Sequence, residues 1–202
     1  MKSSDGAGER LVRQLAFLLE VDKLKGVLRQ TLLLDGSRRE NDAEHSWHLA
    51  VMALLLVEHA NEPVDLTRVV RMLLVHDMVE IDAGDTYVYD VEAGRDKAER
   101  ETRAAERLFA LPPPDQGADL RALWDEFEAR ATPEARFASA LDRLQPLLHN
   151  HRTGGASWKA HGVTRSQVLA RNAAMAEGAP ALWACAQALV EDAVAQGFLD
   201  GA

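Results

Sequence analysis

Residues 71–85 read RMLLVHDMVEIDAGD, an apolar run that ends in a His-Asp pair and is followed by further carboxylates. In a helix each residue turns by about 100°, so His76 and Asp77 can reach one ion only over the edge between them. Glu80 is one turn beyond His76, roughly 40° around, and can hang over the same ion. Asp85 follows in a turn, where it could orient water or a substrate hydroxyl. Carboxylates beside an apolar face need partners, so other segments should supply them.

Apolar residues elsewhere in the chain recur at the 3.6-residue period of helices, with little strict alternation. Ala and Leu are plentiful, whereas aromatic residues make up only 5% of the 202 residues. These features predict an all-α fold, in which residues 86–91 form at most a short extended piece. Helices are expected near 9–25, 42–58, 64–82, 95–110, 117–130, 134–148, 164–177 and 180–198.

The turn and linker signals along the chain predict a single domain over residues 9–202, after a flexible tail at 1–8. No linker is long enough to mark a second domain, because the Pro112 to Asp119 turn has ordinary connecting length. Asp42 is a plausible N-cap for the helix at 42–58. Pro146 is expected to kink or shorten the last turn of the helix at 134–148.

Two further ionisable residues stand on apolar helix faces. His45 shares a face with Leu49 and Met52, and Asp142 is flanked by Leu141 and Leu144. Together with the His-Asp pair, they give two imidazoles and two carboxylates, which suits Mn, Fe, Co, Zn or Mg. Four protein ligands leave open positions on a six-coordinate ion for water and a phosphate oxygen. A general acid or base at Glu80 would then stand where proton transfer needs it.

Each of these residues also has an ordinary structural interpretation. A lone core histidine is more often a hydrogen-bonded structural group than a ligand, and Glu80 alone would be a surface carboxylate at a helix end. Asp142 alone would be an ion-pair partner for Arg143 or Arg136. The joint pattern favours a metal site, because four ligand-type residues on three apolar helix faces are hard to explain separately.

Composition excludes several classes of partner. The chain has 23 Lys and Arg against 32 Asp and Glu, a net charge of −9, which argues against a nucleic-acid polymer or an anionic membrane as partner. Cys185 is the only cysteine, so no intramolecular disulfide can form, as expected in a reducing compartment. The start MKSSDGAGER lacks the apolar core of a signal peptide. We expect a cytoplasmic protein without a membrane span.

The motifs in this order resemble the HD-domain metal-dependent phosphohydrolase superfamily. SRRENDAEHSWHLAVMALLL, LLVHDMVEIDAGD and PEARFASALDRLQPLL are similar to the branch that includes the 5′-deoxynucleotidases. The likeness spans about residues 15–150. It implies one divalent metal ion and a catalytic acid or base at Glu80. The implied metal ligands are His45, chosen over His48 by the AEHS match, with His76, Asp77 and Asp142.

The resemblance also implies phosphate-binding arginines before the first metal histidine. Arg38 matches one of them by its place in SRREN, and Arg29 matches the upstream one within a residue of register. The family's tryptophan after the upstream arginine is absent, since Gln30, Thr31 and Leu32 follow here. Selection for a 2′-deoxyribose is therefore left open.

The expected activity is metal-dependent release of phosphate from (deoxy)nucleoside 5′-monophosphates. The alternatives are hydrolysis of another phosphate ester, such as an alarmone or cyclic nucleotide, and a non-catalytic metal-containing nucleotide sensor. The resemblance favours a homodimer, in which the C-terminal helix, with Trp183 and Phe198, packs on a second subunit or only closes its own core.

The C-terminal part, with helices near 164–198, carries no motif of its own. Trp158 in its Gly-rich loop is a lid over substrate or, more simply, a pinned loop aromatic. We expect surface or capping roles for three histidines that no motif covers: His149, His151 and His161.

Overall fold

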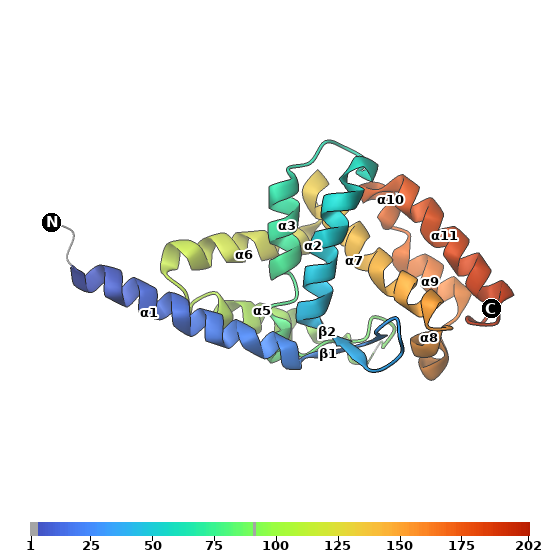
Figure 1. Cartoon of the computed structure of the whole chain (residues 1–202), viewed down its shortest axis with the longest axis horizontal. Coiled ribbons are helices and arrows are strands. Elements are labelled where there is room, and N and C mark those ends of the chain that lie inside the picture. The colour runs from blue at the N-terminus through green and yellow to red at the C-terminus, as the bar shows by residue number, and fades with distance from the viewer. Residues whose placement is uncertain (1–3, 91) are drawn as a thin grey trace.

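A computed structural model describes residues 4–90 and 92–202. The prediction of an all-α fold is confirmed, since helices make up nearly all of the regular structure (Figure 1). The helices are α1 (Ser4–Val21), η1 (Asp22–Gly26), α2 (Asp42–Leu56), η2 (Val57–His59), α3 (Leu66–Val75), α4 (Glu80–Ala83), α5 (Lys97–Leu108), α6 (Pro114–Ala129), α7 (Pro133–Arg152), α8 (Ala156–His161), α9 (Arg165–Asn172), α10 (Met175–Gly178) and α11 (Pro180–Ala195). Strands β1 (Leu28–Leu32) and β2 (Arg39–Asn41) form an antiparallel hairpin that the helical periodicity did not predict.

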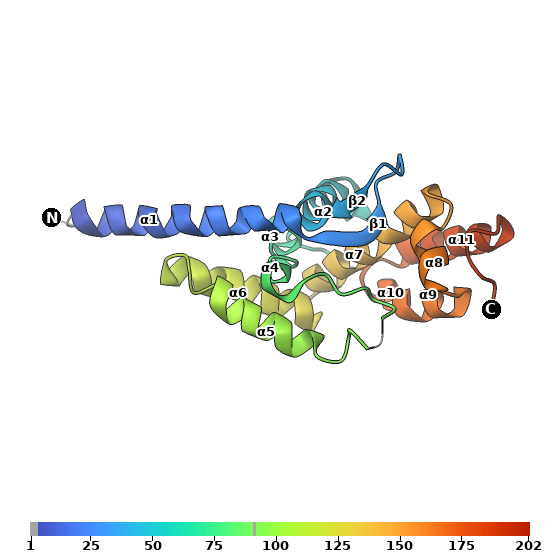
Figure 2. The same cartoon turned by 90° about the horizontal axis from the view of Figure 1, so that it is seen from below.

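Helix α7 is the centre of the arrangement. It crosses the middle of the molecule and packs against α2, α3, α10 and α11 (Figure 1). Phe137, Leu141 and Leu144 of α7 are buried within one hydrophobic core that extends from Phe17 to Leu199. Seen from below, α1, α2 and the hairpin lie on one side, and α5 and α6 lie on the other (Figure 2). Residues on α7 are therefore within reach of most other elements.

The start of α2 differs by one residue from the prediction. Asn41, not Asp42, is the N-cap, and its side chain accepts a hydrogen bond from the backbone N–H of Glu44. The Glu44 side chain in turn accepts from the Asn41 backbone N–H, which completes a capping box. Asp42 is thereby free for another role and is fully buried.

The single helix predicted over residues 64–82 is broken after the His-Asp pair. Asp65 caps α3 as expected, but the helix ends at Val75. The backbone then tightens into i to i−3 hydrogen bonds, such as Glu80 N–H to the Asp77 carbonyl at 2.9 Å. Such a turn advances by about 120° per residue, so Glu80 lies over Asp77 rather than over His76.

Helix α1 begins earlier and is more exposed than predicted. It starts at Ser4, so residues 4–8 of the expected tail are helical, while residues 1–3 lie outside the described part. Its predicted apolar stripe faces solvent, because α1 extends beyond the body of the molecule (Figure 1). Phe17 and, just after the helix, Leu24 are buried.

Three other segments depart from expectation. Helix α7 continues through Pro146 to Arg152, so the predicted shortening is wrong. Residues 86–90 form a loop with a turn rather than an extended piece, and residue 91 lies outside the described part. Trp183 and Phe198 near the C-terminus are partly buried against the chain's own core.

Within the described ranges, none of the helices combines the length and the apolar character needed to cross a membrane.

Candidate metal centre and adjoining cavity

Four donor atoms from separate parts of the chain converge beside α7. The Nε2 atom of His45 on α2 lies 3.0 Å from Oδ1 of Asp142 on α7. After α3, Nε2 of His76 lies 3.1 Å from Oδ2 of Asp77. The cross distances, His45 Nε2 to Asp77 Oδ2 and His76 Nε2 to Asp142 Oδ1, are both 3.8 Å. Ligands at about 2.0–2.2 Å from an ion are spaced roughly this far apart, so the four residues could hold a divalent cation.

Hydrogen bonding prepares the His76 ring for this role. Its Nδ1–H donates to the Leu73 carbonyl at 2.9 Å, which fixes the ring so that Nε2 faces the carboxylates. The Nε2 atom is buried and has no hydrogen-bond partner, although carboxylate oxygens lie close to it. A buried nitrogen without a partner beside anionic oxygens is the arrangement that a cation would complete.

The four residues shift one another's pKa values, so that a charged imidazole stands beside charged carboxylates. Burial alone would lower the pKa of His76, but Asp77 and Asp142 raise it to about 10. Burial would raise the pKa of Asp142, but hydrogen bonds from His45 and His76 hold it well below its usual value. Both carboxylates are therefore ionised and can balance the charge of a divalent ion.

A second group of carboxylates adjoins the first. Oxygen atoms of Asp42, Asp77 and Glu80 lie within 4.8 Å of one another. Burial raises the pKa of Glu80 well above its usual value, and Asp77 and Asp42 add to that rise. Burial and Asp77 likewise raise the pKa of Asp42 to about 7. The Glu80 carboxyl is therefore more readily protonated than an exposed glutamate, and its Oε2 has no hydrogen-bond partner.

Arg29 closes this carboxylate group on the side of the hairpin. Its Nη1 atom lies 3.0 Å from Asp77 Oδ2 and 3.3 Å from Asp42 Oδ1, and its side chain is 13% exposed. Arg29 and Asp85 both line a cavity next to the four donors, as does Asp142. Burial raises the pKa of Asp85, so this carboxyl also sits in a poorly hydrated place.

The structure does not bring Arg38 to the cavity. Its guanidinium pairs with the Glu44 carboxylate, Nη1 to Oε2 at 2.9 Å, and its side chain is 51% exposed. This pairing is a consequence of the capping box, which fixes Glu44 at the start of α2 beside the hairpin.

Sequence reasoning missed most of the cavity wall. Trp158, Tyr87 and Tyr89 contribute rings, and Trp158 is fully buried, so it is pinned in place rather than free to move as a lid. Three arginines from well-separated helices also line the cavity: Arg130, Arg143 and Arg171. Arginine is common in polar helices, so no pattern in the sequence marked these three, although Arg143 directly follows the ligand candidate Asp142.

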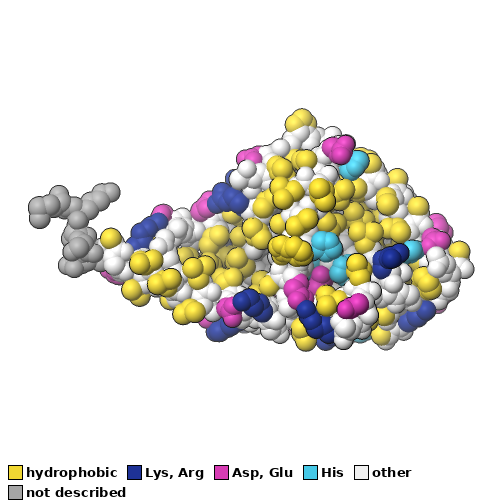
Figure 3. Space-filling model, viewed as in Figure 1, with side chains coloured by type: hydrophobic (Ala, Val, Ile, Leu, Met, Phe, Trp, Pro, Cys, Tyr) yellow, Lys and Arg dark blue, Asp and Glu magenta, His cyan; other side chains and the backbone are white. Residues whose placement is uncertain are grey.

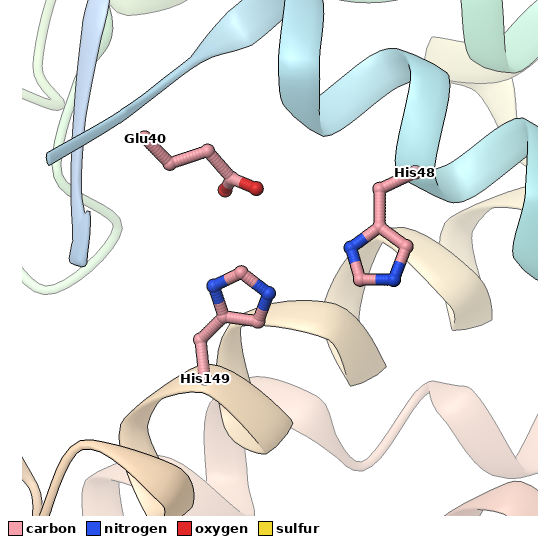
Figure 4. Close-up of side chains that lie close together, drawn as sticks. All are labelled: Glu40, His48 and His149. Atoms are coloured by element: carbon pink, nitrogen blue, oxygen red, sulfur yellow. The ribbon is translucent and has the colours of Figure 1, made fainter. Parts of the chain in front are cut away.

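A third cluster lies behind the donors. Glu40, His48 and His149 point toward one another from β2, α2 and α7 (Figure 4). His149 Nδ1–H donates to the Leu32 carbonyl, and the Gln145 amide contacts both His149 Nε2 and Glu40 Oε1, at 3.0 and 2.7 Å. The predicted surface or capping role of His149 is therefore wrong, because the ring is buried in a hydrogen-bonded network.

The remaining histidines behave as expected of surface groups. His161 is exposed and lies 3.3 Å from the Gln30 side chain, and His151 Nε2 pairs with Asp192 at 2.6 Å. His48 belongs to the cluster with Glu40 and not to the group around His76.

Comparison with known families and proteins is consistent with this geometry. The family model described as an HD domain matches residues 21–183. A Bos taurus protein named 5′-deoxynucleotidase HDDC2 is 36% identical over 145 residues, 71% of this chain and 68% of that protein. The Homo sapiens protein of the same name is 33% identical over 71% of this chain and 68% of its own length.

A crystal structure of a predicted metal-dependent phosphohydrolase from Magnetospirillum magnetotacticum is more similar still. It is 60% identical, with a TM-score of 0.90 over 95% of this chain and 96% of that one. A conserved hypothetical protein from Pyrococcus furiosus, 21% identical with a TM-score of 0.58 over 77% of this chain and 94% of its own, shares the fold.

Proposed function

This chain belongs to the HD-domain family, and we propose that it is a metal-dependent phosphohydrolase that releases phosphate from (deoxy)nucleoside 5′-monophosphates. The observation that carries the proposal is the convergence of four donors, one of which, Asp142, lines a cavity that also holds Arg29 and aromatic rings. The names of the similar proteins, 5′-deoxynucleotidase and metal-dependent phosphohydrolase, support the same reaction class.

In this proposal His45, His76, Asp77 and Asp142 hold one divalent ion of Mn, Co, Mg, Fe or Zn. When bound, such an ion polarises a phosphate oxygen and lowers the pKa of a coordinated water.

The chain's own residues supply the other functions. Arg29 binds the phosphate dianion from the carboxylate side of the cavity, where its planar guanidinium can make two hydrogen bonds. Glu80, whose pKa burial raises well above its usual value, gives a proton to the 5′-oxygen as that oxygen leaves. Asp85 orients water or a sugar hydroxyl. Arg38 stays a predicted phosphate ligand only if its contact with Glu44 opens.

Selection against ribose is not expected. Thr31 lies on the cavity wall where relatives of the nucleotidase branch carry a tryptophan, and its hydroxyl contacts Glu40 at 3.3 Å. A threonine held in this way leaves room beside the sugar, so we propose that ribonucleotides and deoxyribonucleotides are both accepted.

The test is phosphate release from a panel of ribo- and deoxyribonucleoside 5′-monophosphates. Metal-stripped protein is resupplied with Mn²⁺, Co²⁺, Mg²⁺ or Zn²⁺, and His76→Ala is compared with His59→Ala, a histidine of η2 outside the cavity. We expect metal-dependent release that is lost in His76→Ala and kept in His59→Ala. Absence of release across the panel, with metal bound, would overturn the proposal.

We further propose a cytoplasmic homodimer. Apolar side chains gather on one face over α2 and along α1 (Figure 3). Exposed members of this face include Leu15 and Leu19 of α1 and Trp47, Leu54 and Leu55 of α2. Exposed apolar side chains that gather on one face mark an interaction site. Cys185 is exposed and unpaired, which suits a reducing compartment.

Sedimentation equilibrium tests the dimer. The paired change Trp47→Glu with Leu54→Glu is expected to give monomers, because two charges would be buried at the interface. The matched change Leu34→Glu, at an exposed leucine outside these two helices, should leave the dimer intact. A wild-type chain that sediments as a monomer at all concentrations would refute the homodimer.

A further inference from the structure

Three arginines of the cavity lack the partners that most arginines elsewhere in this protein have. Arg68 pairs with Glu126, Arg107 with Asp82 and Glu20, and Arg165 with Glu191, as several others pair with nearby acids. Within the described residues, Arg130, Arg143 and Arg171 have no carboxylate oxygen within 4.0 Å. Arg13, Arg39 and Arg152 also lack an ion pair in the described ranges, but they do not line the cavity.

Their internal contacts do not replace a counter-ion. Arg143 donates to the Arg171 backbone carbonyl and lies 3.4 Å from the Ser139 hydroxyl. The Nε atom of Arg130 is buried without any hydrogen-bond partner. Asp142 acts on Arg143 and Arg171 from beyond ion-pair distance, and its carboxylate is already directed at His45.

The group is electrostatically unfavourable when it is empty. Arg143 is half-buried and shares the cavity with Arg130 and Arg171, so three like charges surround one space. Burial and Arg130 lower the pKa of Arg171. A protein that keeps three mutually repelling cations around one cavity has a use for an anion there.

The backbone at Arg130 is an independent sign. This residue ends α6 in the left-handed conformation, with φ of 51°. Within residues 4–90 and 92–202 it is the only residue other than glycine with positive φ. Strain of this kind persists where the surrounding structure holds a side chain in a required place.

The cavity therefore has two cationic regions of different make-up. One contains Arg29 and Asp142, the proposed metal ligand that lines the cavity, and the other contains the three arginines. One phosphate group cannot satisfy both if it is bound for hydrolysis at the first. Planar guanidinium groups favour phosphate, which accepts paired hydrogen bonds.

We infer that the preferred substrate carries a second phosphate group, as a nucleoside 3′,5′-bisphosphate does, and that Arg130, Arg143 and Arg171 bind this second group. The inference rests on the proposed phosphohydrolase function and narrows its substrate class. The 5′-phosphate lies at the Arg29 end, the aromatic rings of Tyr87 and Tyr89 flank the nucleoside, and the remaining phosphate lies against the arginines.

The experiment compares kcat/KM for phosphate release from three nucleotides of one base: the 5′-monophosphate, the 5′-diphosphate and the 3′,5′-bisphosphate. Wild type, Arg143→Gln, Arg171→Gln and Arg143→Lys are measured with the same metal ion. Arg165→Gln is the matched control, because Arg165 is exposed and pairs with Glu191 outside the cavity. Thermal midpoints verify that each variant is folded.

We expect wild type to favour the bisphosphate over the monophosphate by about 10-fold or more. Either glutamine variant should lower kcat/KM for the bisphosphate by about 10- to 100-fold, mainly through KM, and change the monophosphate by less than about threefold. Arg143→Lys should restore part of the lost kcat/KM, since lysine supplies the charge but not the paired donors of a planar guanidinium.

The outcomes separate this inference from the proposed function. Equal kcat/KM for the monophosphate and bisphosphate, with glutamine variants that lower both alike, overturns the inference and leaves the phosphohydrolase intact. Preference for the 5′-diphosphate also overturns it, because the second phosphate would then adjoin the first. If no nucleotide is hydrolysed, titration calorimetry of the 3′,5′-bisphosphate decides: binding lost in Arg143→Gln supports the arginine site, and no binding to wild type overturns it.

Discussion

The two regions of the cavity differ in sign and in the way their charge is balanced. Around His76, imidazoles, carboxylates and Arg29 lie within 3–4 Å of one another, and pKa values move in opposite directions to accommodate them. Around Arg143, the cations repel one another, and within the described residues no carboxylate lies at ion-pair distance from them. The first region is suited to a cation and the second to an anion. A metal ion in the first and a phosphate group in the second would balance both.

The largest expected effect tests the protonated carboxyl of the first region. Glu80→Gln should lower kcat by about 10²- to 10⁴-fold, because an amide cannot give a proton to the leaving oxygen. Metal content after dialysis should stay at the wild-type level, since Glu80 is not among the four proposed ligands. Kinetics and elemental analysis of the same preparation measure the two quantities.

Aspartate 125 offers the matched control for that variant. It is exposed on α6 and pairs with Arg121, so Asp125→Asn should retain full turnover. Turnover of Glu80→Gln close to that of wild type would remove Glu80 from the mechanism.

The next effect is the pH dependence of stability in metal-free protein. His76 has a folded pKa of about 10 against an ordinary 6.5, so its stabilising contribution is complete below pH 6.5 and is lost as pH rises through 10. Asp42, with a folded pKa of about 7 against 3.8, adds a penalty that develops between these values. The thermal midpoint should thus fall by about 5 °C or more from pH 6 to pH 10.

Added Mn²⁺ should reverse that trend, because the metal needs deprotonated ligands and binds more tightly as pH rises. Calorimetric scans with EDTA and with Mn²⁺ measure both curves. A metal-free midpoint that rises between pH 6 and 10 contradicts the charge arrangement described for His76, and a flatter profile in His76→Ala would identify its source.

A smaller effect is expected at the arginines. There a substitution should stabilise the protein, whereas a substitution in the core usually destabilises it. Arg143→Gln should raise the thermal midpoint of the ligand-free protein by about 2–4 °C, because it removes a repelling buried charge. Differential scanning calorimetry of Arg143→Gln beside Arg165→Gln, which should change little, measures this. A lower midpoint in Arg143→Gln would show that the arginine is structural.

The smallest effect is predicted for Arg38. Its side chain is half exposed and pairs with Glu44 away from the cavity, so Arg38→Ala should change kcat/KM by less than about threefold. Arg29→Ala, measured in the same assay, should lower it far more. Equal losses in the two variants would return Arg38 to the site.

Periodicity and motif spacing were sufficient to predict the helical fold and to select the residues that converge on α7. His45, His76, Asp77 and Asp142 could be chosen because polar groups on apolar helix faces are rare and their order matched a family. The break after Val75 could not be seen, since RMLLVHDMVE continues a helical pattern through it. Glu80 was consequently placed over His76, whereas it lies over Asp77.

Other parts of the site depend on tertiary contacts that leave no local pattern. Arg130 and Arg171 stand in polar helices where arginine is ordinary, and only folding brings them to one cavity. The hairpin is short, and its register has an irregularity between Leu28 and Leu32, so no alternation predicted it. His149 was assigned to the surface because a histidine near a helix end usually lies there, whereas α7 is covered on several sides.

The contact between His45 and Asp142 joins residues 97 positions apart. In an unfolded chain such groups are too distant to act as one chelating site, so a divalent ion binds the native state far better than the denatured ensemble. Folding and ion capture are therefore linked, and the concentration of free metal sets how long each molecule stays folded. In a cell short of that metal, the earliest loss would be of intact protein, degraded through its open states, rather than of catalytic rate.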